Sequence, residues 1–217
     1  MSLLYEVLPV GDLQCNSVIL YDPDSKEAVL FDPGDEAENI LNSLKRLSCK
    51  IISIVHTHAH FDHVMATEKI IKENSEKIPL YLHQEDKFLW EKLSDQTASF
   101  GMPSDIKTLP QIDKWLKDDD IITIGGEKIK TIHTPGHSPG SCCFFYDNKD
   151  NPILISGDTV FYGSIGRTDL WGGDMSQLMN SIHDKIIGLP DETKIIPGHG
   201  PSTTISEEKK HNPFFVR

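Results

Sequence analysis

Histidines gather in one short stretch of this sequence, THAHFDH at residues 57–63, with a further histidine just before it. Imidazole and carboxylate side chains without thiolates suit zinc, iron or manganese. His58 and His60 are two residues apart, so in an extended backbone their side chains point the same way and could bind one ion. Asp62 and His63 lie at the bend that follows and could turn toward a second ion. Because imidazoles clustered at a strand end without a metal are costly once they protonate, the spacing predicts a metal site rather than a solvated polar loop.

Four later segments place a metal-capable or charged residue beside glycine, proline or another such residue: TPGH at 134–137, SGD at 156–158, GRTD at 166–169 and PGHG at 197–200. Glycine lets the backbone approach a crowded site, and proline fixes a turn. Taken alone, each of three residues could be either an ordinary turn residue or a metal ligand: His137, Asp158 and His199. Each follows a β-rich run, however, and we expect those strands to deliver all three to the same sheet edge as the first cluster.

The elements that must position these side chains follow from hydrophobic periodicity. Short apolar runs separated by turn residues predict strands in the N-terminal third at Leu3–Pro9, Ser17–Tyr21 and Ala28–Phe31. The spacing over residues 35–47 is that of an amphipathic helix. Ile51–Val55 is a β-branched run, typical of a strand buried on both faces, and it leads into the histidine cluster. A helix over residues 64–71 would place Asp62 near its N-cap, so the cluster occupies a strand-to-helix loop.

Residues 95–113 lose this periodicity and gather turn-forming residues, which predicts a long connection or lid, with Phe100 and Met102 as apolar contacts for a substrate. The second half repeats the logic of the first, with strands predicted at Ile121–Ile124, Ile129–Ile132, Cys142–Tyr146, Ile153–Ile155 and Lys194–Ile196 and a helix over Met175–Ile187. No internal repeat, low-complexity segment or linker divides the chain. We therefore expect one domain over residues 1–217.

Composition limits the classes of function. The 217 residues carry a net charge of −12, so the chain repels phosphate groups and we expect neither nucleic-acid nor membrane binding. The first twenty residues lack a cationic leader, and no later stretch approaches a membrane span. The four cysteines show no CxxC spacing, which indicates reduced thiols and a cytoplasmic location. The adjacent Cys142 and Cys143 are expected to point to opposite faces of their strand.

The series THAHFDH, TPGHSPG, SGDTVF, GRTDLWGGD and IPGHGP resembles the metallo-β-lactamase-fold hydrolases, and closely their glyoxalase II-like (hydroxyacylglutathione hydrolase-like) branch. The resemblance runs from the Asp32-Pro33-Gly34 turn to the HNPFF tail. It implies an α/β fold, an αββα sandwich of two mixed sheets with flanking helices and the site between the sheets. Only 18 residues follow His199, so it implies a short form without the helical C-terminal domain of longer glyoxalase II enzymes.

The resemblance also implies a role for individual residues. Two divalent metal ions are implied, with zinc as the first choice and iron or manganese as alternatives. The implied ligands are His58, His60 and His137 for the first ion, Asp62, His63 and His199 for the second, and Asp158 for both. His56 matches no ligand of the family, and we expect it to be a neighbour in the strand. Arg167 stands where the family places a cation that meets the glutathione carboxylate.

These expectations lead to a reaction. A hydroxide held between two metal ions is a nucleophile at neutral pH, and Asp62 and Asp158 would orient it. We therefore expect a dinuclear thioester hydrolase whose partner is a small-molecule thioester, S-acylglutathione first, acting as a monomer or small homo-oligomer. The alternative from the same fold is a persulfide dioxygenase, with a single iron held by residues matching His58, His137 and Asp158. A β-lactamase is disfavoured by Asp158 and by the lack of an export signal, and a non-catalytic metal-binding domain is a lesser alternative.

Overall fold

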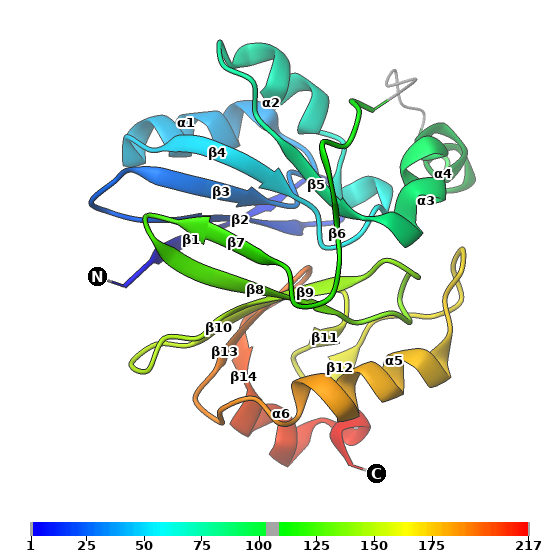
Figure 1. Cartoon of the computed structure of the whole chain (residues 1–217). Helices are drawn as coiled ribbons and strands as arrows, with labels where there is room; N and C mark the ends of the chain where they lie inside the picture. The colour runs from blue at the N-terminus through cyan, green and yellow to red at the C-terminus, as the bar shows by residue number, and fades with distance from the viewer. Residues whose placement is uncertain (1, 103–108, 217) are drawn as a thin grey trace.

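Two β-sheets lie face to face in the computed structural model, which describes residues 2–102 and 109–216 (Figure 1). The first sheet contains, in order across it, β1 (Leu4–Val10), β2 (Cys15–Tyr21), β3 (Glu27–Phe31), β4 (Lys50–Val55), β5 (Leu80–His83) and β6 (Lys114–Leu116). Strands β1 to β3 pair antiparallel, whereas β3 to β6 pair in parallel. The first sheet is therefore mixed, as predicted.

The second sheet is also mixed. Its strands are, in order, β14 (Thr203–Thr204), β13 (Lys194–Pro197), β10 (Ile153–Gly157), β9 (Cys142–Tyr146), β8 (Glu127–His133) and β7 (Ile121–Ile124). β10 and β13 pair in parallel, and the other neighbours pair antiparallel. A small hairpin of β11 (Val160–Phe161) and β12 (Ser164–Ile165) stands beside this sheet.

Helices cover the outer face of each sheet (Figure 1). The first sheet carries α1 (Ala37–Leu47), α2 (Thr67–Glu73), α3 (Lys87–Glu91) and α4 (Leu93–Ser99), with one-turn 3-10 helices at Phe61–His63 and Gln84–Asp86. The second carries α5 (Met175–Ser181), which continues as a π-helix over Ile182–Ile186, then α6 (Ile205–His211) and a 3-10 turn at Pro213–Phe215. None of the described helices is long and apolar enough to cross a membrane.

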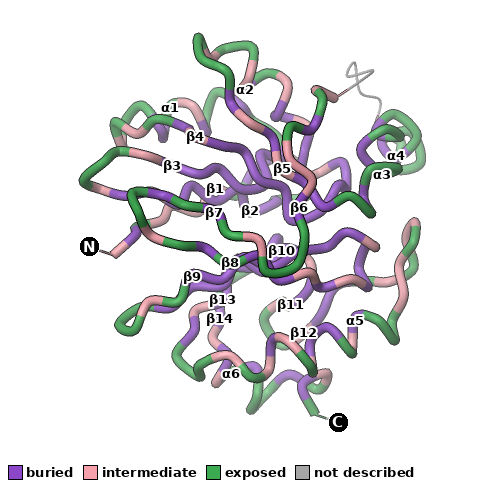
Figure 2. Tube along the Cα trace, viewed as in Figure 1, coloured by how far each residue is buried: buried purple, intermediate pink, exposed green. Residues whose placement is uncertain are grey.

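The core forms three apolar layers, because the strands alternate their side chains between two buried faces. Val18 and Leu20 pack between the sheets, whereas Ile19 faces the helices on the first sheet. Cys142 and Cys143 likewise belong to different layers, which confirms the prediction of opposite faces. Figure 2 shows buried residues running along the strands and exposed residues at the outer turns. The predicted αββα sandwich is confirmed.

Two predictions about local structure need correction. Asp62 does not cap α2: it lies inside the 61–63 turn, and α2 begins at Thr67, after Ala66. The residues between them are held by other hydrogen bonds, including the one from the N–H of Ala66 to the carbonyl of Pro33 at 3.0 Å.

Residues 95–99, predicted as part of a long connection, are helical in α4. The elements β5, α3 and β6 were not predicted. These elements are short, so packing rather than local periodicity determines them. The part of the predicted lid at 103–108 lies outside the described residues.

Candidate metal centre

The loop that carries the first histidines runs from the end of β4 into the 61–63 turn, and buried side chains hold its backbone from outside. Asp86 accepts a hydrogen bond from the N–H of Ala59 at 2.9 Å. The amide of Gln96 accepts one from the N–H of Phe61 at 3.1 Å and donates one to the carbonyl of Ala59 at 3.0 Å. Asp86 also accepts from the N–H of Gly140 at 2.6 Å, and Gly140 belongs to the loop that carries the next histidine. One buried carboxylate therefore connects two histidine-bearing loops.

Three of the predicted ligands, His58, His60 and His137, form one group of buried side chains. The Nε2 atoms of His58 and His137 are 3.2 Å apart, and Nδ1 of His60 is 2.8 Å from Nε2 of His137. Nδ1 of His137 donates to the carbonyl of Arg167 at 2.7 Å, and Nδ1 of His58 donates to the Thr57 hydroxyl at 3.0 Å. These bonds orient both rings so that Nε2 faces the group.

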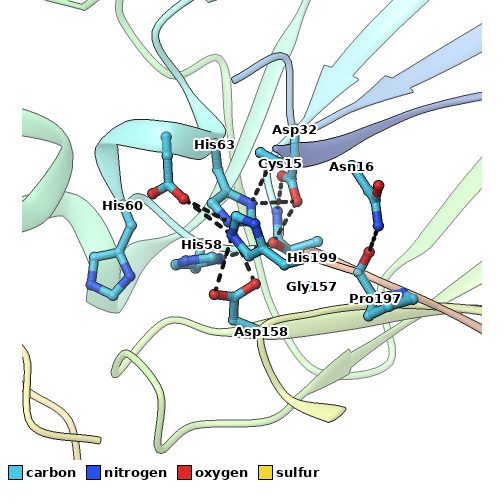
Figure 3. Close-up of polar contacts among 12 residues, drawn as sticks. Cys15, Asn16, Asp32, His58, His60, His63, Gly157, Asp158, Pro197 and His199 are labelled. Carbon is cyan, nitrogen blue, oxygen red and sulfur yellow. Dashed lines mark hydrogen bonds and ion pairs between the residues drawn. The ribbon is translucent and has the colours of Figure 1, made fainter. Parts of the chain in front are cut away.

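A second group contains Asp62, His63 and His199. Figure 3 shows the rings of His63 and His199 close together. Nε2 of His199 is 3.1 Å from a carboxylate oxygen of Asp62, and Nε2 of His63 is 3.7 Å from the same oxygen. Here too Nδ1 sets the ring orientation. His63 donates to Asp32 at 3.0 Å, and His199 donates to the carbonyl of Leu13 at 2.9 Å.

Asp158 faces both groups, and Figure 3 shows it beside His63 and His199. Its Oδ1 is 3.5 Å from Nε2 of His63, and its Oδ2 is 3.5 Å from Nε2 of His137 and 3.8 Å from Nε2 of His199. The parallel pairing of β10 with β13 brings Asp158 and His199 together at neighbouring strand ends. A Cβ atom on Gly198 would lie only 2.1 Å from Oδ1 of Asp158, so this close approach requires glycine there.

These side chains fit a divalent cation better than a hydrogen-bonded core. Burial, and then neighbouring imidazoles, hold the pKa of His58 well below its usual range, so the ring is neutral. With Nδ1 acting as the donor in both His58 and His137, their Nε2 lone pairs face each other at 3.2 Å, an arrangement that a shared cation stabilises. Nε2 of His63 and Oδ1 of Asp158 are buried without a hydrogen-bond partner among the described residues. Buried polar atoms left without a partner in this way are typical of metal ligands.

The carboxylates make the second group attractive to positive charge. Burial lowers the pKa of His63, but Cys15, Asp62 and Asp158 outweigh it and raise the pKa well above its usual range. Burial also lowers the pKa of His199, but the hydrogen bond to Asp62 and the charge of Asp158 outweigh it, and the pKa is raised above its usual value. Both shifts show that the site stabilises a cation, as a metal-binding group must.

Sequence reasoning did not assign a role to Asp32, Asp86 or Gln96. Asp32 accepts from the backbone and the hydroxyl of Thr57, each at 2.7 Å, as well as from His63. The DPG turn was visible in the sequence, and Asp32 has a left-handed φ of 46°, but nothing indicated where its side chain points. Asp86 and Gln96 bond to backbone atoms, and such bonds leave no periodic pattern in a sequence.

A cavity of about 460 Å³ opens onto both groups. Arg167 lines it, but its Nε and Nη2 donate to the carboxylate of Asp169 at 2.6 and 2.7 Å. Three aromatic residues, Phe61, Phe100 and Trp171, form one side of the cavity, which we name the aromatic wall. Met102, predicted beside Phe100 as a substrate contact, packs against the core on the first sheet instead.

His56 lies outside both groups. It is fully buried, its ring centroid is 5.0 Å from that of Trp90, and its Nε2 is 3.3 Å from the Thr67 hydroxyl. Burial lowers its pKa to about 4. The structure thus places His56 in the packing behind the loop, in keeping with its interpretation as a neighbour rather than a ligand.

Comparisons with known proteins agree with this geometry. Residues 10–199 match the family model described as the metallo-beta-lactamase superfamily. The crystal structure of BLEG-1, titled a B3 metallo-beta-lactamase, is similar with a TM-score of 0.89 and 42% identity, covering 99% of this chain and 100% of that one. The structure of TTHA1623 in a di-iron-bound form has a TM-score of 0.85 and 34% identity, covering 96% and 99%.

Among curated relatives, the hydroxyacylglutathione hydrolase GloC of Haemophilus influenzae is 37% identical over 210 residues, which is 96% of each chain. The names of these similar proteins point to different reactions, so the comparisons establish the family rather than the substrate. The family match, the sandwich fold and the paired His and Asp groups together show that this chain belongs to the metallo-β-lactamase superfamily.

Proposed function

We propose that this chain is a dinuclear metal-dependent hydrolase of small thioesters, with S-acylglutathione as the first substrate to test. The observation that carries the proposal is the position of Asp158, whose two carboxylate oxygens face His63 on one side and His137 and His199 on the other. A carboxylate shared by two imidazole-containing groups suits two neighbouring ions better than one. The di-iron-bound form of TTHA1623 and the name of GloC support the proposal.

In this proposal one ion would be held by His58, His60 and His137, and the second by Asp62, His63 and His199. Asp158, which faces both groups, would be a ligand to both ions. Two bound divalent ions supply a water molecule of lowered pKa and polarise the carbonyl group of an ester. Zinc is our first choice, with iron or manganese as alternatives.

The protein's own residues then have defined tasks. Asp32 and the carbonyls of Leu13 and Arg167 fix the rings of three ligating histidines. Asp62 and Asp158 face the cavity and can accept a proton from a water held there. A thiolate leaving group needs no prior protonation, because thiols have a pKa near 8.5.

The test is metal content measured together with thioester turnover. We expect about two equivalents of metal per chain by elemental mass spectrometry, and release of glutathione from S-lactoylglutathione followed with a thiol reagent. Removal of the metal should abolish turnover while the circular dichroism spectrum keeps its folded shape. Asp158→Asn should lower both metal content and turnover, whereas Asp191→Asn, which changes an exposed carboxylate paired with Lys209, should alter neither.

Other results would contradict the proposal. One equivalent of iron per chain, with oxygen uptake in the presence of glutathione persulfide and no thioester turnover, would identify the persulfide dioxygenase alternative. Bound metal with no turnover of any of these substrates would favour a non-catalytic metal-binding domain.

Hydrolysis of a β-lactam is a second candidate function, favoured by the similarity to BLEG-1. A chromogenic cephalosporin tested on the same metal-loaded preparation decides it. A rate for the cephalosporin far above the rate for S-lactoylglutathione would replace the thioester proposal.

A further inference from the structure

The aromatic wall extends from the first histidine group to the edge of the cavity. The rings of Phe61 and Phe100 have centroids 5.1 Å apart, and those of Phe100 and Trp171 are 6.2 Å apart. The Trp171 ring in turn lies 6.1 Å from the imidazole of His60. The three aromatic rings therefore form a continuous apolar surface that begins beside a candidate metal ligand.

Phe100 is 40% exposed at this wall although it is large and apolar. An apolar surface next to a cluster of polar groups inside a cavity is the usual composition of a small-molecule site. Phe61, the third member of the wall, is buried and supports the more exposed ring of Phe100.

Apart from the proposed metal ions, the side chains that line the cavity offer little positive charge to an anionic group. Among the cavity-lining residues that the structure describes, Arg167 is the only lysine or arginine. Its guanidinium already pairs with the carboxylate of Asp169. The net charge of −12 further disfavours approach of an anion.

We propose that the aromatic wall binds an apolar aryl or alkyl group attached directly to the scissile thioester, and that Trp171 and Phe100 determine this preference. This inference rests on the proposed thioester hydrolysis for its choice of substrate. The apolar group can belong to the acyl half or to the thiol half of the substrate, and the experiment distinguishes the two.

The first arm compares S-phenylacetylglutathione with S-lactoylglutathione, which changes the acyl half alone. The second arm compares the benzyl thioester of lactate with S-lactoylglutathione, which changes the thiol half alone. We expect kcat/KM to be at least about tenfold higher for the apolar member of one pair, since burial of an aryl group is worth at least that factor. The arm that shows the preference identifies which half of the substrate lies on the wall.

Variants of the wall should remove that preference. Phe100→Ala and Trp171→Ala should each reduce the ratio of kcat/KM values by about fivefold to tenfold, mainly through KM, and Phe100→Leu should retain much of it. Because Phe100 is partly exposed, its variant is expected to fold even where Trp171→Ala does not. The matched control is Tyr162→Ala, which removes an aromatic ring that is 62% exposed, near the cavity but not part of its lining.

A binding measurement keeps this inference separate from the proposed reaction. The metal-loaded chain is titrated by calorimetry with S-benzylglutathione and S-methylglutathione, two thioethers that cannot be hydrolysed as esters, and with benzyl methyl sulfide. Tighter binding of a benzyl compound that disappears in Phe100→Ala supports the wall even if no thioester is turned over, in which case the proposed reaction alone fails. Equal binding of benzyl and methyl compounds together with equal kcat/KM values, or a preference that survives in both wall variants, would overturn the inference while leaving thioester hydrolysis in place.

Discussion

Replacing Asp86 with alanine should separate the loops that carry the candidate metal ligands. Asp86 is fully buried and accepts hydrogen bonds from the N–H groups of Ala59 and Gly140 and from the hydroxyl of Ser138. The Ser138 hydroxyl has another partner in Ser141, at 2.8 Å, but the two backbone donors would be left without one. At about 1–3 kcal/mol for each buried unpaired donor, the loss is about 2–6 kcal/mol of unfolding free energy.

Asp86→Asn should cost less, about 1–3 kcal/mol, because the amide keeps one acceptor and the shape of the side chain. Burial raises the pKa of Asp86, so the neutral amide also avoids the desolvation cost of a charged group. The unfolding free energy is measured by urea titration of the metal-free chain, so that metal binding does not enter the comparison.

The same variants should weaken metal binding without touching a ligand. We expect the affinity for zinc, measured by competition with a chromophoric chelator, to fall by about 10- to 100-fold in Asp86→Ala. Asp22→Ala is the control: Asp22 also accepts from two backbone N–H groups, of Asp24 at 3.0 Å and Ser25 at 3.3 Å, but in a turn remote from the site. It should lose stability and keep its zinc affinity. A folded Asp86→Ala chain that binds zinc as tightly as the wild type would refute this reasoning.

Three further predictions concern other parts of the molecule. Gly34→Ala should lower the unfolding free energy severely, because the new Cβ would lie 1.9 Å from the carbonyl oxygen of Asp62. Gly188→Ala is the control: Gly188 has open space around it, so the midpoint of urea unfolding should change little. Equal midpoints for the two variants would contradict the packing argument. Asp32→Asn keeps a residue type that tolerates the left-handed φ of 46°, but the amide should orient His63 less firmly than the carboxylate does. The affinity for zinc should therefore fall by about tenfold in the chelator competition. An unchanged affinity would exclude this role of Asp32. Burial, and then the neighbouring His133, lower the pKa of His83 to about 4 from a usual 6.5. The folded chain therefore binds this proton more weakly than the unfolded chain does. The free energy of unfolding should be unaffected by His83 above pH 6.5 and should fall as the pH drops toward 4. His83→Gln should make that fall shallower in urea titrations between pH 7 and 4, and parallel pH profiles would contradict it.

The elements that sequence reasoning found are those in which side-chain type repeats with a period. The two-residue spacing of His58 and His60 indicated a shared orientation, and the structure brings both to His137. Asp158 and His199 followed from strand runs that end in glycine-containing turns, and the parallel β10–β13 pair places them together. The αββα fold class, by contrast, was implied by the resemblance to the family.

What sequence reasoning missed depends on contacts between distant backbone segments. Gln96 bonds to Ala59 and Phe61 from a helix of seven residues, which is too short to show a clear period. The predicted N-cap role of Asp62 failed because its carboxylate is directed toward His199 instead. Arg167 lines the cavity, and its contact with a glutathione carboxylate stays a prediction. Its pairing with Asp169, only two residues away, could not be inferred from the motif.

The two groups of ligating side chains draw on both sheets, and this has a kinetic consequence. Asn16, on a strand of the first sheet, donates to the carbonyl of Pro197 on the second, across 181 residues of chain, beside the bond from His199 to Leu13. Neither group of ligands is complete until the sheets have docked, so contacts of very high sequence separation must form first, and folding is expected to be slow. An ion that binds only after docking stabilises the docked state by mass action and so slows its opening. The supply of metal would then control the lifetime of the folded chain as well as its chemistry.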